Sequence, residues 1–400
     1  MTRTIGRDAR ATGLGAAGVA VTVATMLTNA LAYLVPLLGA RRLTAADLGA
    51  LATLLALGAI STVPGFGLQI AVAAHRARTG PTSTRRLSLL TAGVSAGLTL
   101  AAAPVLTVAL RLPFALTLLL AAATFATVLS GRWLGELQGD QRFLRLSAAM
   151  TVLAVGRYGG PALGLALGLG LFGCLLIGTL TGILALPLLA RLAAARPGPR
   201  PPTVAPADRL VPRQVVTACA ATLAMLTISY ADLILARQLL PADGSGAYAV
   251  GAVLTKGALW APQVVTLLVL PRLAQGDRRA RATALALILA CGSALVAAAT
   301  LGGELAFRLA GGADYLHLAG EAPLFAATGA LYAVVFMLVN DRVASGARFP
   351  AAPLWVATAG LAAATTLLAP RTVEGVQTCA LATAALTAAV MAGLVFRPRR

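Results

Sequence analysis

The sequence predicts an all-α, polytopic membrane protein with about twelve transmembrane helices, arranged as two six-helix parallel repeats around a central cavity. Three observations predict this fold class. The 400-residue chain is 58% hydrophobic and only 11% charged, whereas a soluble domain has roughly 25% charged residues. Apolar runs long enough to cross a bilayer recur along the whole chain. A short polar hinge sequence occurs twice, once in each half.

A bilayer core takes about 20 apolar residues per helix, and the sequence contains twelve such runs. The fifth and sixth runs are almost continuous, and we place their boundary at the glycines of "LGLGLFG" (167–173). The first run follows a basic start, as a signal peptide does, but its apolar stretch is too long for one, so we expect a transmembrane helix. The runs are 14–38, 48–72, 87–110, 113–135, 148–168, 171–191, 214–236, 247–270, 282–303, 322–339, 351–369 and 376–396.

The basic residues set the orientation. With the N-terminus inside, 24 of the 32 basic residues fall in cytoplasmic segments and 6 in external loops, the bias expected of a correctly placed set of spans. We therefore expect a multi-pass protein of the cytoplasmic membrane, surrounded by lipid, with both termini in the cytoplasm. Because topology accounts for most of the net charge of +19, no nucleic-acid partner is predicted. The two remaining basic residues, Arg157 and Lys256, lie within predicted helices.

The repeated hinge divides the chain into halves. "ARRLTAADLGA" (40–50) and "ARQLLPADGSGAYA" (236–249) each carry Arg, Leu, Ala-Asp and Gly-Ala, and each joins the first two helices of a half. Pro64 and Pro262 follow the two hinges at a matching offset. Since six is even, both halves enter the membrane the same way round, as the parallel repeats of some transporters do. We predict an N-terminal lobe at 1–194, a cytoplasmic linker at 195–212 and a C-terminal lobe at 213–400.

The sequence contains few of the residue patterns that are typical of an enzyme active site. The cysteines all lie inside apolar runs without a CxxC partner or a nearby histidine, so we predict no metal, no disulfide framework and no cofactor. A membrane glycosyltransferase or polymerase would need a carboxylate or histidine constellation on a sizeable loop, and every predicted external loop is short. We predict a transporter rather than an enzyme. The cysteines are Cys174, Cys219, Cys291 and Cys379.

Three blocks of the sequence resemble a known family. They are "LVPLLGARRLTAADLGALATLLALGAISTVPGFGLQIAVAAHRAR" (34–78), "GELQGDQRFLRLSAAM" (135–150) and "YADLILARQLLPADGSGAYAVGAVLTKGALWAPQVVTLLVLPRLA" (230–274). They are similar to polysaccharide biosynthesis membrane proteins, the O-antigen and exopolysaccharide flippases of the multidrug/oligosaccharidyl-lipid/polysaccharide exporter superfamily. The resemblance implies alternating-access transport of a lipid-linked (polyprenyl-pyrophosphate) sugar to the outer leaflet. Polysaccharide polymerases or glycosyltransferases are the protein partners that it implies.

Arg157 is a candidate substrate residue in the fifth helix. An unpaired arginine in the bilayer costs at least ~2.5 kcal/mol, and guanidinium is the usual bidentate partner of phosphate. A pyrophosphate-linked polyprenol would suit it. The alternative is that the helix starts later than predicted and Arg157 reaches the cytoplasmic headgroups.

Asp232 and Lys256 are a second candidate pair. They lie at similar depths in the neighbouring seventh and eighth helices, and Lys256 is the only lysine in the chain. The pair is either a structural ion pair or one that titrates or contacts substrate. Asn29 and Tyr33 in the first helix, with Asn340 and Asp341 in the tenth, line a cavity or form interhelical hydrogen bonds.

A cation-coupled multidrug exporter of the same superfamily is the main alternative function. Such exporters generally use an acidic residue in the first helix, and the run 14–38 contains none. A membrane glycosyltransferase or polymerase is the remaining alternative.

Overall fold

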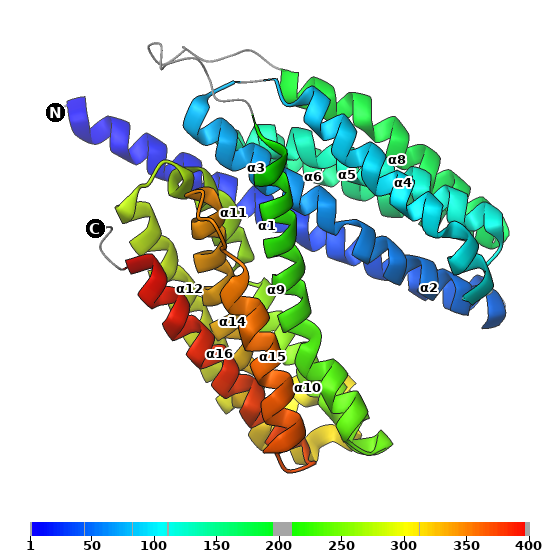
Figure 1. The fold of residues 1–400 in the computed structure, drawn as a ribbon, viewed down its shortest axis with the longest axis vertical. Helices are drawn as coiled ribbons and strands as arrows, with labels where there is room; N and C mark the ends of the chain where they lie inside the picture. Colours follow the sequence, from blue (N-terminus) through cyan, green and yellow to red (C-terminus); the bar gives the residue numbers. More distant parts are fainter. Residues whose placement is uncertain are drawn as a thin grey trace. The chain divides into compact units, whose positions relative to one another are not determined.

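The computed structural model describes residues 2–43, 45–81, 83–109, 112–194, 210–311 and 313–396. Every regular element in these ranges is a helix (Figure 1). The chain divides into two compact units, Met1–Cys219 and Ala220–Arg400, and the boundary falls inside α9 (Pro212–Leu239). We refer to these units as the N-terminal and C-terminal lobes. Most of the predicted linker, 195–209, lies outside the described residues.

The N-terminal lobe is built from eight α-helices and one π-helical turn, η1. They are α1 (Thr2–Arg42), α2 (Ala45–Ser61), α3 (Val63–Thr79), α4 (Arg85–Ala109), α5 (Phe114–Gly139), α6 (Phe143–Ala154), η1 (Val155–Gly159), α7 (Gly160–Ala166) and α8 (Gly170–Ala194). The C-terminal lobe follows a similar order. After α9 come α10 (Ala242–Trp260), α11 (Gln263–Ala274), α12 (Arg278–Leu301), α13 (Gly303–Gly311), the 3₁₀ segment η2 (Ala313–Glu321), α14 (Ala322–Ala344), α15 (Ala352–Leu367) and α16 (Val373–Phe396).

The helices account for twelve membrane passes. Nine helical stretches in the described residues are long and apolar enough to cross a bilayer. The other three passes are α1, with its apolar part Ala17–Ala32, the shorter helix α15 (Ala352–Leu367), and the continuous segment α6–η1–α7. These passes match the twelve predicted runs one for one.

The prolines of the predicted repeat mark a helix break in each lobe. The second pass is divided into α2 and α3, with Pro64 in the first turn of α3. The eighth pass is divided into α10 and α11, where Pro262 caps α11. Proline has no backbone N–H and cannot continue the preceding helix. Both breaks fall inside runs that we predicted as continuous.

The uncertain boundary between the fifth and sixth passes lies at the predicted glycines. Helix α7 ends at Ala166 and α8 begins at Gly170. Gly168 and Gly170 have φ of 72° and 66°, a left-handed conformation that glycine adopts without steric penalty. The tight turn therefore depends on glycine at these two positions.

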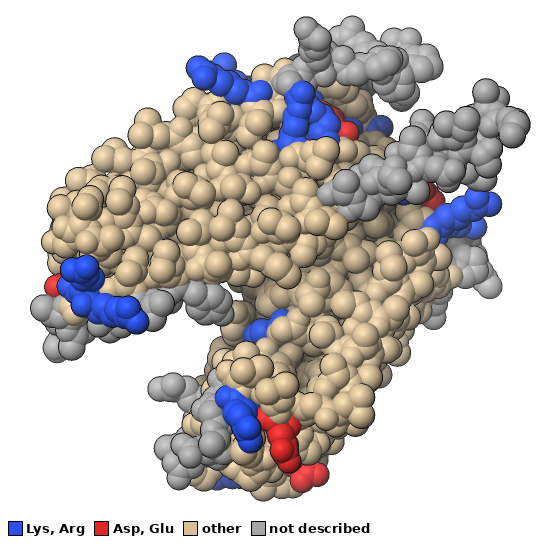
Figure 2. Space-filling model, turned by 180° about the vertical axis from the view of Figure 1, so that it is seen from behind, with Lys and Arg blue, Asp and Glu red and all other residues tan. Residues whose placement is uncertain are grey.

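Each lobe is packed around one central helix. In the N-terminal lobe α5 contacts both α3 and α4, and in the C-terminal lobe α14 contacts α10, α12 and α16. Figure 2 shows the charged side chains gathered in a few patches, with a broad uncharged surface over the rest of this face. Large apolar side chains are exposed on this kind of surface, among them Leu98, Val108 and Leu301. Such a surface fits a lipid environment.

Candidate functional site

A line of buried polar side chains crosses the C-terminal lobe from α9 through α10 and α16 to α14. The Tyr248 hydroxyl lies 3.0 Å from Oδ2 of Asp232 and 3.0 Å from Oε1 of Gln377. The Gln377 amide donates to the Thr328 hydroxyl at 2.9 Å, and that hydroxyl donates to the Leu324 carbonyl at 2.9 Å. Asp232 is 2% exposed and Tyr248, Gln377 and Thr328 are 0% exposed. We call this line the Asp232 chain.

The hydrogen bonds of the Asp232 chain can be completed by a proton on Asp232. Tyr248 has one hydroxyl hydrogen but contacts two acceptors, and the Oε1 of Gln377 has no hydrogen to give. If Tyr248 donates to Gln377, its contact with Asp232 requires a hydrogen on the Asp232 carboxyl. Every contact in the chain is then a hydrogen bond running from Asp232 to the Leu324 carbonyl. With Asp232 ionised and the Gln377 amide oriented as here, one of the two Tyr248 contacts would bring two oxygens together without a hydrogen.

Lys256 does not pair directly with Asp232. Its ammonium donates to the Ser229 carbonyl and lies 3.5 Å from the centroid of the Tyr230 ring. Ser229 precedes Asp232 by three residues, less than one turn of α9. The expected ion pair is therefore replaced by a cation–π contact close to the acid.

Arg157 lies in the N-terminal lobe, within the π-helical turn η1. In a π-turn the Gly156 carbonyl would accept from the N–H of Pro161, which proline lacks. The Thr181 hydroxyl of α8 donates to this carbonyl instead, at 2.6 Å. Pro161 and Thr181 therefore hold the wide turn that carries Arg157. This departs from the continuous α-helix that we predicted.

The Arg157 guanidinium has few partners. It donates to the Gly58 carbonyl of α2 at 3.4 Å and lies 5.3 Å from the centre of the neighbouring Tyr158 ring. No carboxylate pairs with it among the described residues, although guanidinium carries five N–H donors. An anion would supply the acceptors that the lobe does not.

The other predicted site residues divide between solvent or lipid exposure and helix packing. Asn29 is exposed on α1, and the Tyr33 side chain lies outside what the structure describes. The Asn340 amide donates to the Phe336 carbonyl at 2.8 Å, and Asp341 accepts from Arg281 of α12. The Asp341 contact is an interhelical hydrogen bond, the second of the two alternatives, whereas the Asn340–Phe336 bond lies within α14.

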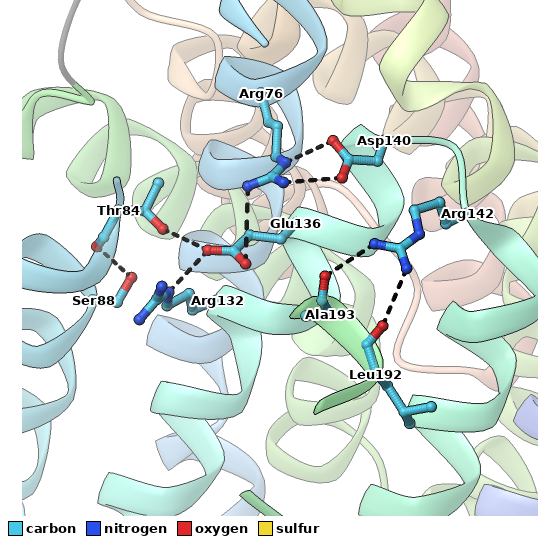
Figure 3. Close-up of polar contacts among 9 residues, drawn as sticks. All are labelled: Arg76, Thr84, Ser88, Arg132, Glu136, Asp140, Arg142, Leu192 and Ala193. Atoms are coloured by element: carbon cyan, nitrogen blue, oxygen red, sulfur yellow. Dashed lines mark hydrogen bonds and ion pairs between the residues drawn. The ribbon is translucent and has the colours of Figure 1, made fainter. Parts of the chain in front are cut away.

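A charged cluster that the sequence did not predict joins α3, α4 and α5 at the arginine-rich end of the N-terminal lobe (Figure 3). Arg76 makes a bidentate pair with Asp140 at 2.6 and 3.0 Å. Glu136 accepts from Arg132 at 2.9 Å and from Thr84 at 3.0 Å, and Arg76 lies 3.9 Å from it. The sequence feature that could have predicted this cluster is the pair of carboxylates, Glu136 and Asp140, about one turn apart in an otherwise basic region.

The C-terminal lobe carries a simpler version of this cluster. Arg281, in the first turn of α12, contacts Oδ1 of Asp341 on α14 through Nε at 3.1 Å and Nη2 at 3.0 Å. Asp341 is 2% exposed. In both lobes an acid near the end of the central helix therefore binds an arginine of a neighbouring helix.

The solved structures that this chain resembles are transporters. An outward-facing multidrug resistance MATE family transporter of the MOP superfamily aligns at a TM-score of 0.69 and 14% identity, covering 94% of this chain and 93% of that one. The eukaryotic MATE transporter AtDTX14 gives 0.69 and 13% over 96% and 94%. A mutant of the Vibrio cholerae MATE transporter VcmN gives 0.64 and 14% over 95% and 96%. The chain has the MATE fold.

At 13–14% identity, this likeness is one of fold. No family model and no curated protein sequence matches the chain, so the comparison with known proteins rests on the fold. The neighbours named here are MATE transporters and not polysaccharide flippases. The predicted flippase type is therefore a finer statement than the fold supports.

Proposed function

We propose that this protein is a membrane exporter driven by protons that bind at Asp232. The MATE fold supports a multidrug exporter, the function that we predicted as the main alternative. The observation that carries proton coupling is the Asp232 chain, whose contacts are all hydrogen bonds when Asp232 carries a proton. Such exporters generally use an acidic residue in the first helix, and the run 14–38 contains none. A buried acid in the seventh pass offers the same chemistry from the other lobe.

Asp232→Asn tests this proposal. The amide keeps a donor toward Tyr248 and so imitates the protonated acid, but it cannot release a proton. In proteoliposomes we expect the variant to fold and to lose export of a lipophilic cation, such as ethidium, under an imposed pH gradient. A sodium gradient without a pH gradient should drive no export by the wild type.

Asp277→Asn is the matched control. Asp277 caps α12 by accepting from the backbone N–H groups of Arg279 and Ala280, and an asparagine side chain caps a helix equally well. This variant should export as the wild type does. Full export by Asp232→Asn would overturn the proposal.

A lipid-linked sugar flippase is a second candidate, favoured by Arg157. A cationic drug gains nothing from a guanidinium that lacks a carboxylate partner, whereas a pyrophosphate would supply its missing acceptors. Deleting the gene tests this candidate, because the polyprenyl-pyrophosphate sugar that the protein moves should accumulate on the inner leaflet. An unchanged pool of lipid-linked sugars would exclude the flippase, and the drug exporter would be the remaining candidate.

A further inference from the structure

Lys256 differs from every other basic residue of the chain. It is the only lysine among 32 basic residues, and it lies partly buried on α10 in an apolar lobe. Arginine presents a rigid fork of five donors, whereas lysine carries a compact ammonium on a flexible four-carbon stem. A lysine is therefore the better residue for a cation that has to change partners.

The present contacts of Lys256 leave its ammonium incompletely coordinated. Of its three donors, one reaches the Ser229 carbonyl, and the Tyr230 ring lies on another side. Neither partner carries a formal charge. The position holds the cation without neutralising it.

A charged partner lies less than one helical turn away. Ser229 and Asp232 are 1% and 2% exposed, so these two residues, three apart on α9, face the same interior. The Lys256 stem leans toward the N-terminus of α10, which is the direction of Tyr248 and hence of the Asp232 carboxyl. A change of rotamer would carry the ammonium from the Ser229 carbonyl in the direction of Asp232.

We propose that Lys256 is a tethered cation that moves from Ser229 and Tyr230 to Asp232 when Asp232 loses its proton. This inference rests on the proposed proton coupling. The Asp232 carboxyl releases its proton to water and becomes a carboxylate, and the Lys256 ammonium keeps all three of its protons throughout. No proton passes between the two side chains.

The groups around Asp232 suit both states. Tyr230 is on its own helix, Tyr248 and Lys256 are on α10, Tyr332 is on α14 and Cys379 is on α16. α15 contributes the apolar Leu361, which packs in one cluster with the neighbouring Ala231. The Tyr332 hydroxyl is buried and has no hydrogen-bond partner among the described residues. It is a donor available to an ionised carboxylate, and Lys256 is the one cation in this set.

The exchange would explain how the protein can complete its transport cycle while Asp232 carries no proton. A lone carboxylate inside an apolar lobe is strongly disfavoured, whereas a carboxylate paired with an ammonium is electrically neutral. When a proton binds, it displaces Lys256 to the position seen here. Lys256 is then a positioning residue that determines when Asp232 can be without its proton.

The single lysine makes the exchange directly observable. Supplying lysine labelled with ¹³C at Cε gives one side-chain signal from the whole chain, which can be followed by NMR in lipid nanodiscs. Over the Tyr230 ring at low pH, the ring current should shift the ε-CH₂ signal upfield. As pH rises and Asp232 ionises, we expect the signal to lose this shift, while in Asp232→Asn it should stay upfield throughout. Tyr230→Leu identifies the ring as the source of the shift.

The titration of the wild-type protein tests the exchange whether or not any variant folds. A Lys256 signal that stays in place across the pH range, or moves in the same way in Asp232→Asn, would overturn the exchange. If that happens while Asp232→Asn has lost proton-driven export, the proposed function stands and only the exchange fails. If Asp232→Asn exports normally, the proposed function fails first.

Discussion

At the scale of single residues, Arg157 shows how one proline positions a charge in an apolar lobe. The missing N–H of Pro161 leaves the Gly156 carbonyl without its helical donor, and Thr181 supplies one at 2.6 Å. The wide turn that results is the kind of local irregularity that π-bulges bring to functional sites. Among the described residues, the guanidinium it carries donates to the Gly58 carbonyl at 3.4 Å and lies over the Tyr158 ring.

If Arg157 binds a phosphate of the substrate, Arg157→Ala should abolish transport of that substrate without changing the amount of protein in the membrane. Arg157→Lys should restore only part of the activity, because ammonium keeps the charge and loses the planar fork. Arg145→Ala, which removes an exposed arginine of α6, is the control and should transport normally. Full transport by the lysine variant would indicate an arginine that only reaches toward headgroups, since lysine does so equally well.

The sequence identified charged residues better than their partners. Asp232, Lys256 and Arg157 stand out because a charge inside an apolar run is rare. Tyr248 and Gln377 do not stand out, since one is an ordinary aromatic residue and the other lies on a helix far along the chain. The proximity of Asp232 and Lys256 in depth was predicted, but their contacts depend on side-chain rotamers that no sequence pattern specifies.

At the scale of elements, a glycine seam joins α3 to α5. A Cβ atom at Gly131, Gly135 or Gly139 would lie 2.3, 2.6 or 2.8 Å from a backbone carbonyl oxygen of α3. These glycines are four residues apart and so line one face of α5, as small residues do where membrane helices pack closely. The spacing was visible in "GRWLGELQG" (131–139). The partner helix was not, because nothing in the local pattern selects α3.

Gly135→Ala should destabilise the N-terminal lobe. The new methyl group would meet the Gln69 carbonyl oxygen at 2.6 Å and the Val72 side chain at 2.9 Å, so α3 and α5 would have to move apart. Overpacking of this kind costs about 1–3 kcal/mol, which should appear as a lower melting temperature in detergent. Gly93→Ala on α4 is the matched control, since nothing lies within 4 Å of its Cβ. It should leave stability unchanged or raise it by up to about 1 kcal/mol. Equal melting temperatures for the two variants would argue against the seam.

At the scale of the whole molecule, the repeat explains why so much of the fold was predictable. Twelve apolar runs and two matching hinges indicated the number of passes and the two halves. The matching prolines, Pro64 and Pro262, lie at helix breaks in both lobes. The breaks themselves were not predicted, because hydrophobicity continues across them. Substrate chemistry was the least predictable property, since it depends on a few polar contacts between helices.

The repeat also makes a prediction about orientation. If each lobe has six passes, an even number, the arginine-rich ends of both lobes lie on the same side of the membrane, and the charge bias places that side in the cytoplasm. In a cysteine-free background, single cysteines at Ser83 and Gln275 should be protected from a membrane-impermeant thiol reagent in intact cells and react after the membrane is opened. Cysteines on the opposite side should react in intact cells, one at Pro113 just before α5 and one at Ser245 in the first turn of α10, ahead of the span that begins at Ala247. Labelling of Gln275 but not Ser83 from outside would mean an odd number of passes between them, and the two lobes would then be inverted rather than parallel repeats.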